Sequence, residues 1–141
     1  MHEMSADEIR EFLSEGTRTA HLATVRSNGQ PHVTPVWFVL DRDDLIFTTG
    51  TRTVKGRNLQ RDPRVCLSVD QPSGAYSFVQ ITGEASLSEH HGELLRWATM
   101  IGGRYMGEEQ AAGFGARNAV PGELLVRVTP DKMVAVADLA D

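Results

Sequence analysis

A cluster of hydroxyl and cationic side chains lies near the middle of the chain, within residues 45–59. An apolar stretch ends in Thr48 and Thr49, a glycine follows, and three cationic residues come next, at positions 52, 55 and 57. Phosphate groups are bound by such parts, because helix N-terminal amides attract anions, hydroxyls donate hydrogen bonds, and Lys and Arg supply charge. The same segment also fits a solvated helix face whose cations point into water. Taken alone, it leaves both interpretations open.

Local patterns place this cluster between a strand and a helix. The apolar run predicts a strand over residues 45–49 and the segment that follows predicts a short helix over 54–61. Asp62-Pro63 ends that helix, because the residue before a proline avoids the helical conformation. The cationic side chains are therefore expected on or just before the first turn of the helix.

The rest of the chain is dominated by period-two patterns. Ser5 and Glu8 have capping-box spacing and Gly16 follows, which predicts a helix over 5–15. Ser88 is expected to begin a second helix that reaches about residue 104, and a glycine-rich connection covers 102–118. The predicted strands are 19–26, 32–40, 45–49, 64–70, 76–87, 124–128 and 132–137, with an Asn-Gly hairpin turn at 28–29 and a further turn at 129–131. Short strands with few helices indicate a barrel or a sandwich.

Composition limits the class of protein. The chain has 141 residues, a net charge of −5 and a single cysteine, Cys66. This length predicts one domain over residues 1–141, and the acidic balance disfavours a nucleic-acid partner. The lone cysteine, the absence of a signal-like start and the absence of a long apolar run lead us to expect a cytoplasmic protein without a membrane segment.

Other chemistry-bearing residues favour ordinary roles. The histidines His21, His32, His90 and His91 lack metal-ligand spacing, so no metal site is expected. Cys66 has no activating neighbour in sequence, and no serine lies in a nucleophile-elbow motif. Catalytic residues therefore stay unassigned. Among the tryptophans, Trp97 has helical spacing typical of a packed side chain, whereas Trp37 lies in a predicted strand and is the better functional candidate.

Several motifs in order carry a resemblance to a known family. They are Gln30-Pro31-His32-Val33-Thr34-Pro35-Val36-Trp37-Phe38, Leu45-Ile46-Phe47-Thr48-Thr49, Lys55-Gly56-Arg57-Asn58-Leu59, Asp62-Pro63-Arg64-Val65 and Gly83-Glu84-Ala85. Over about residues 8–137 the chain resembles the pyridoxamine-phosphate-oxidase-like split-barrel family. More narrowly, it is similar to the branch of deazaflavin-dependent reductases that use coenzyme F-420, common in actinobacteria.

The resemblance implies a mainly β fold with flanking helices: a six-stranded antiparallel split β-barrel that forms a homodimer with cofactor sites at the interface. It places Thr53, Lys55 and Arg57 at the cofactor phosphate, with Val54 and Asn58 close by. The tricyclic ring would run along Thr34, Pro35, Val36 and Trp37 and along Thr48 and Thr49. Some relatives carry an arginine where this chain has Thr53.

The function implied by the resemblance is hydride transfer from reduced F-420 to a small electrophilic or unsaturated organic substrate. Two alternatives remain open at this point: an FMN-dependent oxidoreductase of the same fold, and a non-catalytic protein that binds a flavin, a deazaflavin or a tetrapyrrole. Oxidation of pyridoxamine phosphate is disfavoured, because residues 126–134 lack the basic closing motif that such oxidases use for their substrate.

Overall fold

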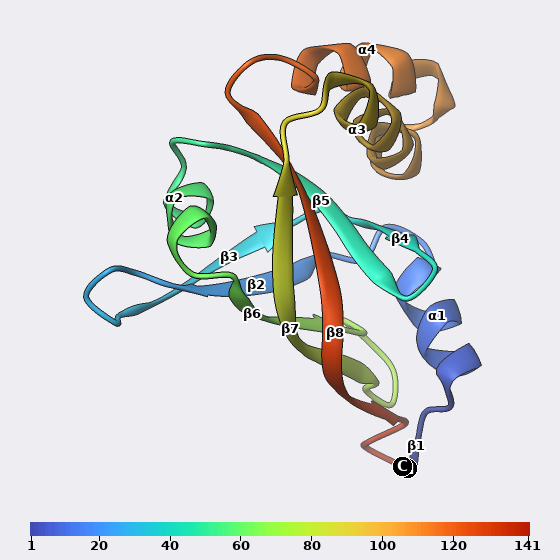
Figure 1. Ribbon diagram of the computed structural model, residues 1–141. Coiled ribbons are helices and arrows are strands. Elements are labelled where there is room, and N and C mark those ends of the chain that lie inside the picture. Colours follow the sequence, from blue (N-terminus) through green and yellow to red (C-terminus); the bar gives the residue numbers. More distant parts are fainter.

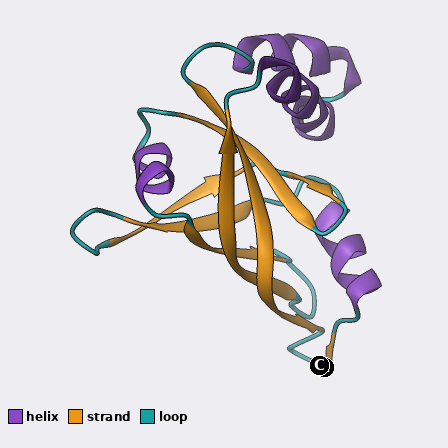
Figure 2. Ribbon diagram, viewed as in Figure 1, coloured by secondary structure: helices purple, strands orange, loops and turns teal.

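The computed structural model describes all residues, 1–141, as a mainly β structure with four helices (Figure 2). No helix has the length and apolar character that crossing a membrane requires. The elements, in chain order, are β1 (His2–Glu3), α1 (Ala6–Ser14), β2 (Ala20–Val25), β3 (Pro31–Val36), β4 (Val39–Asp41), β5 (Asp44–Gly50), α2 (Val54–Arg61), β6 (Arg64–Asp70), β7 (Phe78–Ser88), α3 (His91–Met106), α4 (Glu108–Asn118) and β8 (Glu123–Ala137).

The strands form one antiparallel sheet with eight members, not the six expected. Its order is β3-β2-β6-β7-β8-β5-β4, with β1 added to β8. The hydrogen-bonded path is not closed, yet its two end strands, β3 and β4, are separated in sequence only by Trp37 and Phe38. A connection this short requires the sheet to curl until its ends meet. Figure 1 shows the long strands β7 and β8 running side by side, with α3 and α4 together at one end of the sheet.

The predicted strand over 32–40 is wrong at Trp37 and Phe38, where the chain changes partner. Val36 is opposite Ala20 of β2, whereas Val39 is opposite Ile46 of β5. The chain thus changes its strand partner from β2 to β5 within two residues. A period-two pattern of side chains cannot predict such a change. Val36 at the end of β3, Phe38, and Val39 at the start of β4 are all buried, so the alternation of exposed and buried residues also breaks here.

The predicted turn at 129–131 is also wrong, because β8 runs without a break from Glu123 to Ala137. Pro130 is opposite Gly83 of β7, next to a register shift between Thr82 and Gly83. A Cβ atom at Gly83 would lie 2.4 Å from the backbone oxygen of Thr129. A bulge opposite a glycine therefore accommodates the proline, which lacks an N–H group for the ladder.

The helices follow their local signals in part. The Ser5–Glu8 capping box is confirmed, and Gly16 just beyond α1 has a φ of +55°. Helix α3 begins after His90, whose Nδ1 accepts the Glu93 amide, so the prediction of Ser88 as its cap is wrong. Ser88 instead ends β7. The segment 102–118, expected to be a connection, contains α4, which packs closely on α3 because a Cβ atom at Gly115 would lie 2.0 Å from Thr99 Oγ1.

The curled sheet encloses the main core. Trp97, predicted to be packed, is buried in a second cluster under α3 with Ile46 and Leu125. The main core contains fully buried side chains from every long strand, among them Leu22, Phe47, Leu67, Ile81 and Val126. Side chains at alternate positions of the same strands must therefore point to the outside of the sheet.

Candidate cofactor site

An opening between β3 and β5 separates the two ends of the sheet. Strand β3 pairs only with β2, and residues 47–50 of β5 pair only with β8. Each strand therefore presents one edge of backbone N–H and C=O groups without a strand partner. We call these two edges, over 31–36 and 47–50, the open seam. Helix α2 contacts β2, β3 and β5, so it lies across one end of the seam.

Two side chains of α3 hold the other end of the seam, at Phe38. The Tyr105 hydroxyl accepts a hydrogen bond from the Phe38 amide at 3.2 Å, and Arg104 Nη1 donates to the Phe38 carbonyl oxygen at 2.7 Å. Arg104 also donates to the backbone oxygens of Leu13 and Gly16. These bonds satisfy backbone groups that the sheet leaves without partners where the chain crosses from β3 to β4.

Trp37 lies beside this junction with its indole ring 41% exposed. Its ring stacks on Tyr105, with 4.8 Å between ring centroids and 6° between planes, and it also contacts Phe114 of α4. The sequence indicated Trp37 as a candidate but did not indicate its aromatic neighbours. They belong to the segment expected to be a connection.

Helix α2 is fixed to the end of β5 through Thr53 and Gly56. The Thr53 hydroxyl accepts the Gly56 amide at 3.0 Å, donates to the Gly50 carbonyl oxygen at 2.9 Å and lies 2.9 Å from Thr49 Oγ1. A Cβ atom at Gly56 would lie 2.0 Å from the Gly50 oxygen, so only glycine allows this approach. Within the chain, the Thr53 side chain caps the helix and thereby orients the amides of its first turn.

The cations of this region have no acidic partner. No carboxylate lies within ion-pair distance of Arg52, Lys55 or Arg57, as is the case for most Lys and Arg residues of the chain; only Arg10, Arg18, Arg64 and Arg127 form ion pairs. Arg52 and Arg57 are exposed and Lys55 is half-buried. Burial lowers the pKa of Lys55 from its usual value, and attraction to the more distant Glu123 opposes that shift. The first turn of α2 thus carries concentrated positive charge.

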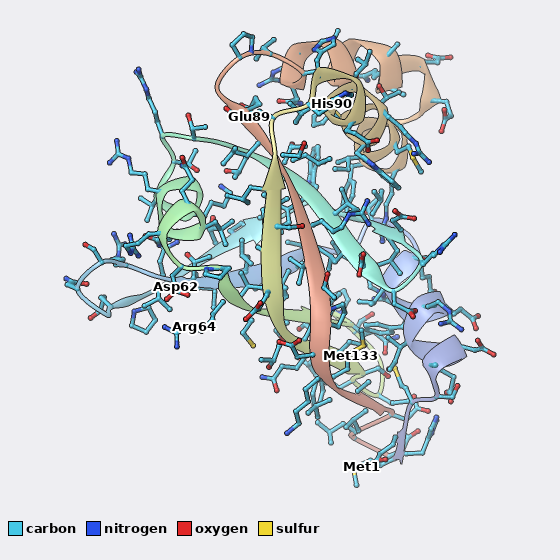
Figure 3. All side chains as sticks on the ribbon, in the orientation of Figure 1. Met1, Asp62, Arg64, Glu89, His90 and Met133 are labelled. Carbon is cyan, nitrogen blue, oxygen red and sulfur yellow. The ribbon has the colours of Figure 1, made fainter.

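Asn58 has a different environment from the other predicted site residues. Its side chain is 4% exposed, and Nδ2 donates to Thr24 Oγ1 of β2 at 3.0 Å. It therefore faces the sheet and joins α2 to β2. The helix ends four residues later at Asp62, which Figure 3 shows beside Arg64, and the two form an ion pair at 2.7 Å. That pair lowers the pKa of Asp62 to about 2.

The predicted ring-binding residues divide between the two faces of the sheet. In β3, Pro35 is exposed and Val36 is buried in the core, and Thr34 shares the face of Val36. In β5, Thr49 is buried and Thr48 is half-buried. The seam brings these two strands to one opening, but a planar ligand there would meet Pro35 and Trp37 through side chains and Thr34 and Val36 through backbone. Val54 lies exposed at the start of α2.

The outer face of β3, β2, β6, β7 and β8 is short of charge. Two cross-strand rows, one of Val33, Ala23, Cys66, Thr82 and Lys132 and the next of Pro35, His21, Ser68, Gln80 and Val134, contain a single charged residue, Lys132 at the β8 end. Val33 is 66% exposed. The rows on either side carry charge, at Arg64 and Glu84 and at Asp70. Depletion of charge is typical of surfaces covered by another protein.

Two cavities of the single chain lie against α1 and at the start of β8. One of about 510 Å³ lies between α1, Leu40 and the bulged part of β8 at Pro130. Another of about 350 Å³ lies under the start of β8, between His91, Leu94 and Glu123. Glu123 and Tyr105 are the site residues that sequence reasoning missed. Each lies more than sixty positions from the residue it approaches, and no local motif marked either one.

Comparison with known proteins agrees with this architecture. The model of the pyridoxamine 5'-phosphate oxidase family matches residues 5–137. The chain therefore belongs to this family. No curated protein sequence matches it.

Solved structures add more distant similarities. A conserved hypothetical protein from Mycobacterium tuberculosis has 27% identity and a TM-score of 0.83, covering 94% of this chain and 84% of the other. An F-420 reductase has 27% identity and a TM-score of 0.68, covering 87% and 94%. A heme storage protein from Vibrio cholerae, at 24% identity and a TM-score of 0.75 over 96% and 97%, supports the fold alone.

Proposed function

We propose that this protein binds the deazaflavin coenzyme F-420 at the open seam and transfers hydride from its reduced form to a small electrophilic or unsaturated organic substrate. One observation carries the proposal: three cations without acidic partners surround the N-terminus of α2, at the mouth of a seam with free backbone edges. Similarity to an F-420 reductase over most of both chains supports the choice of cofactor.

The residues present fit the phosphate of such a cofactor. Lys55 and Arg57 supply charge, and the N-terminus of α2 favours an anion, although the Thr53 cap already accepts the Gly56 amide. Asn58 is proposed to position α2 through Thr24, because its side chain faces the sheet. Thr53 would act on the phosphate chiefly through the helix that it caps.

The ring of the cofactor fits the seam itself. Backbone groups of β3 and of 47–49 that have no strand partner can bond the polar edge of a flavin-like ring, and the side chains of Pro35 and Trp37 provide a flat apolar border. A reduced deazaflavin supplies the hydride, and the protein's part is to orient the ring and exclude water. The substrate is proposed to approach beside Trp37.

A second copy of the chain is proposed to complete the site. The two rows with few charges adjoin β3, and their exposed apolar members Val33 and Val134 favour burial against a partner. The homodimer would cover the seam from outside.

Fluorescence titration of F-420 tests the proposal. The wild-type protein is expected to change the deazaflavin emission at micromolar protein, and Lys55→Ala is expected to lose on the order of 1.5–3 kcal/mol of binding free energy, because it removes a charge-assisted contact. Arg117→Ala is the matched control, since Arg117 is exposed on α4. It should bind as the wild type does.

The same titration with FMN separates the alternatives within the family. Tighter binding of FMN than of F-420 would favour an FMN-dependent oxidoreductase. Tight binding of either cofactor without reduction of any acceptor would favour a non-catalytic binder. Unchanged cofactor affinity in Lys55→Ala would show that the phosphate does not bind at α2.

A further inference from the structure

Glu123 places a carboxylate beside the cationic end of α2. Glu123 is opposite Gly50 in the β5–β8 ladder. A Cβ atom at Gly50 would lie 3.7 Å from Glu123 Oε1 and 3.5 Å from Thr53 Cγ2. The carboxylate therefore lies over the last residue of β5, next to the residue that caps α2.

Nothing in the chain stabilises this carboxylate by direct contact. No hydrogen bond or ion pair reaches its oxygens, although the side chain is half-buried. Its attraction to Lys55 acts over more than ion-pair distance, and burial raises the pKa of Glu123. The Glu123 side chain keeps contact with solvent, and the negative charge of its ionised carboxylate acts on any anion that is bound beside Lys55.

We propose that Glu123 selects the charge of the phosphate that the site accepts, disfavouring a doubly charged phosphate monoester relative to a singly charged phosphodiester. This inference rests on the proposed function, because it concerns the same anion site. Near neutral pH a monoester carries up to about two negative charges, and a diester carries a single one. The carboxylate repels the monoester more strongly, while Lys55 and Arg57 attract both.

The selection has a consequence for the choice of cofactor. FMN ends in a phosphate monoester, whereas the phosphate of F-420 is a diester within its side chain. Both cofactors present a tricyclic ring, so the ring and the cations alone distinguish them poorly. A negative charge beside Lys55 provides the distinction at the phosphate.

The experiment compares two ligands with the same ring, FMN and the monomethyl ester of FMN, at pH 8. Glu123→Gln keeps the shape of the side chain and removes its charge. Coulomb's law over about 6 Å, with an effective dielectric constant between about 40 and the value of about 80 in water, predicts that this change raises the affinity for FMN about 3- to 10-fold more than the affinity for the methyl ester. Glu109 is an exposed carboxylate on α4, so Glu109→Gln is the control. It should leave the ratio of the FMN affinity to the methyl-ester affinity unchanged.

Each outcome decides the matter. A larger gain for FMN supports the charge selection. An equal gain for both ligands, or no gain, overturns it while leaving the anion site in place. If neither flavin nor F-420 binds the wild type, the proposed function fails and the selection fails with it. Thermal unfolding of Glu123→Gln checks that the variant is folded.

Discussion

The Tyr105 hydroxyl accepts the backbone N–H of Phe38 at 3.2 Å, at the point where the chain crosses between the two ends of the sheet. It also donates to the Arg18 carbonyl oxygen at 2.6 Å. One side chain of α3 thus satisfies two backbone groups that no strand can reach. Its ring supports Trp37 at the same time.

Tyr105→Phe is therefore expected to destabilise the fold while keeping the aromatic stack. Loss of the hydroxyl leaves the Phe38 amide and the Arg18 carbonyl oxygen without this hydrogen-bond partner. This loss costs about 1–3 kcal/mol in the free energy of unfolding. Urea denaturation followed by circular dichroism measures the change. Tyr76→Phe is the control, because Tyr76 is 52% exposed and its hydroxyl has no hydrogen bond. An equal effect in both variants would contradict the role of Tyr105.

Gly56→Ala and Gly113→Ala are expected to act in opposite directions. At Gly56 the new methyl group would lie 2.0 Å from the Gly50 oxygen, so α2 must move away from β5. The cost is about 1–3 kcal/mol of stability, and F-420 affinity should fall with it. At Gly113 no atom lies within 4 Å, and a helical Gly→Ala change adds about 0.5–1 kcal/mol. Melting temperatures and F-420 titration of the two variants provide the measurements, and a stabilised Gly56→Ala would show that α2 is not held as described.

The Asn58–Thr24 contact is expected to show energetic coupling. A double-mutant cycle of Asn58→Ala and Thr24→Val should give a coupling free energy of about 0.5–1.5 kcal/mol, because a single buried hydrogen bond joins the two side chains. Additive effects on the free energy of unfolding would exclude that bond. F-420 affinity should fall in both single variants to a similar extent, since both loosen the same helix.

Asp62 provides a prediction for low pH. Its hydrogen bonds from Arg64 lower its pKa from 3.8 to about 2, so the folded state favours the ionised form. The resulting stabilisation is complete above the unfolded pKa and is lost as the pH falls toward 2. An NMR titration of the carboxyl carbon between pH 5 and pH 2 measures the pKa directly. Arg64→Ala should return it toward 3.8, and no change in that variant would exclude the pair.

Local chemistry explains which parts of the fold were predictable. The sequence predicts α2 with the bounds the structure has, because Asp62-Pro63 ends it within the same segment. The capping box of α1 is equally local. The family resemblance also indicated the basic turn and both strands of the seam. It did not indicate which side chains of these strands face the core and which face outward.

Distant partners explain what the sequence missed. The run at Pro130 has every feature of a turn, and only the glycine opposite it in β7 allows the strand to continue. Likewise, α4 contains Gly113 and Gly115, and glycine disfavours a helix, yet Gly115 allows close packing on Thr99 of α3. Glu123 approaches Lys55 only because β5 and β8 pair in this register.

The position of β8 has a consequence for the order of folding. This strand is the last element of the chain, yet it lies between β7 and β5 and also pairs with β1. During synthesis on the ribosome, β5 and β7 must wait with exposed edges until the C-terminal residues emerge. The sheet is therefore expected to form late and in one step, and a nascent chain stopped before residue 123 would depend on chaperones to stay free of aggregation.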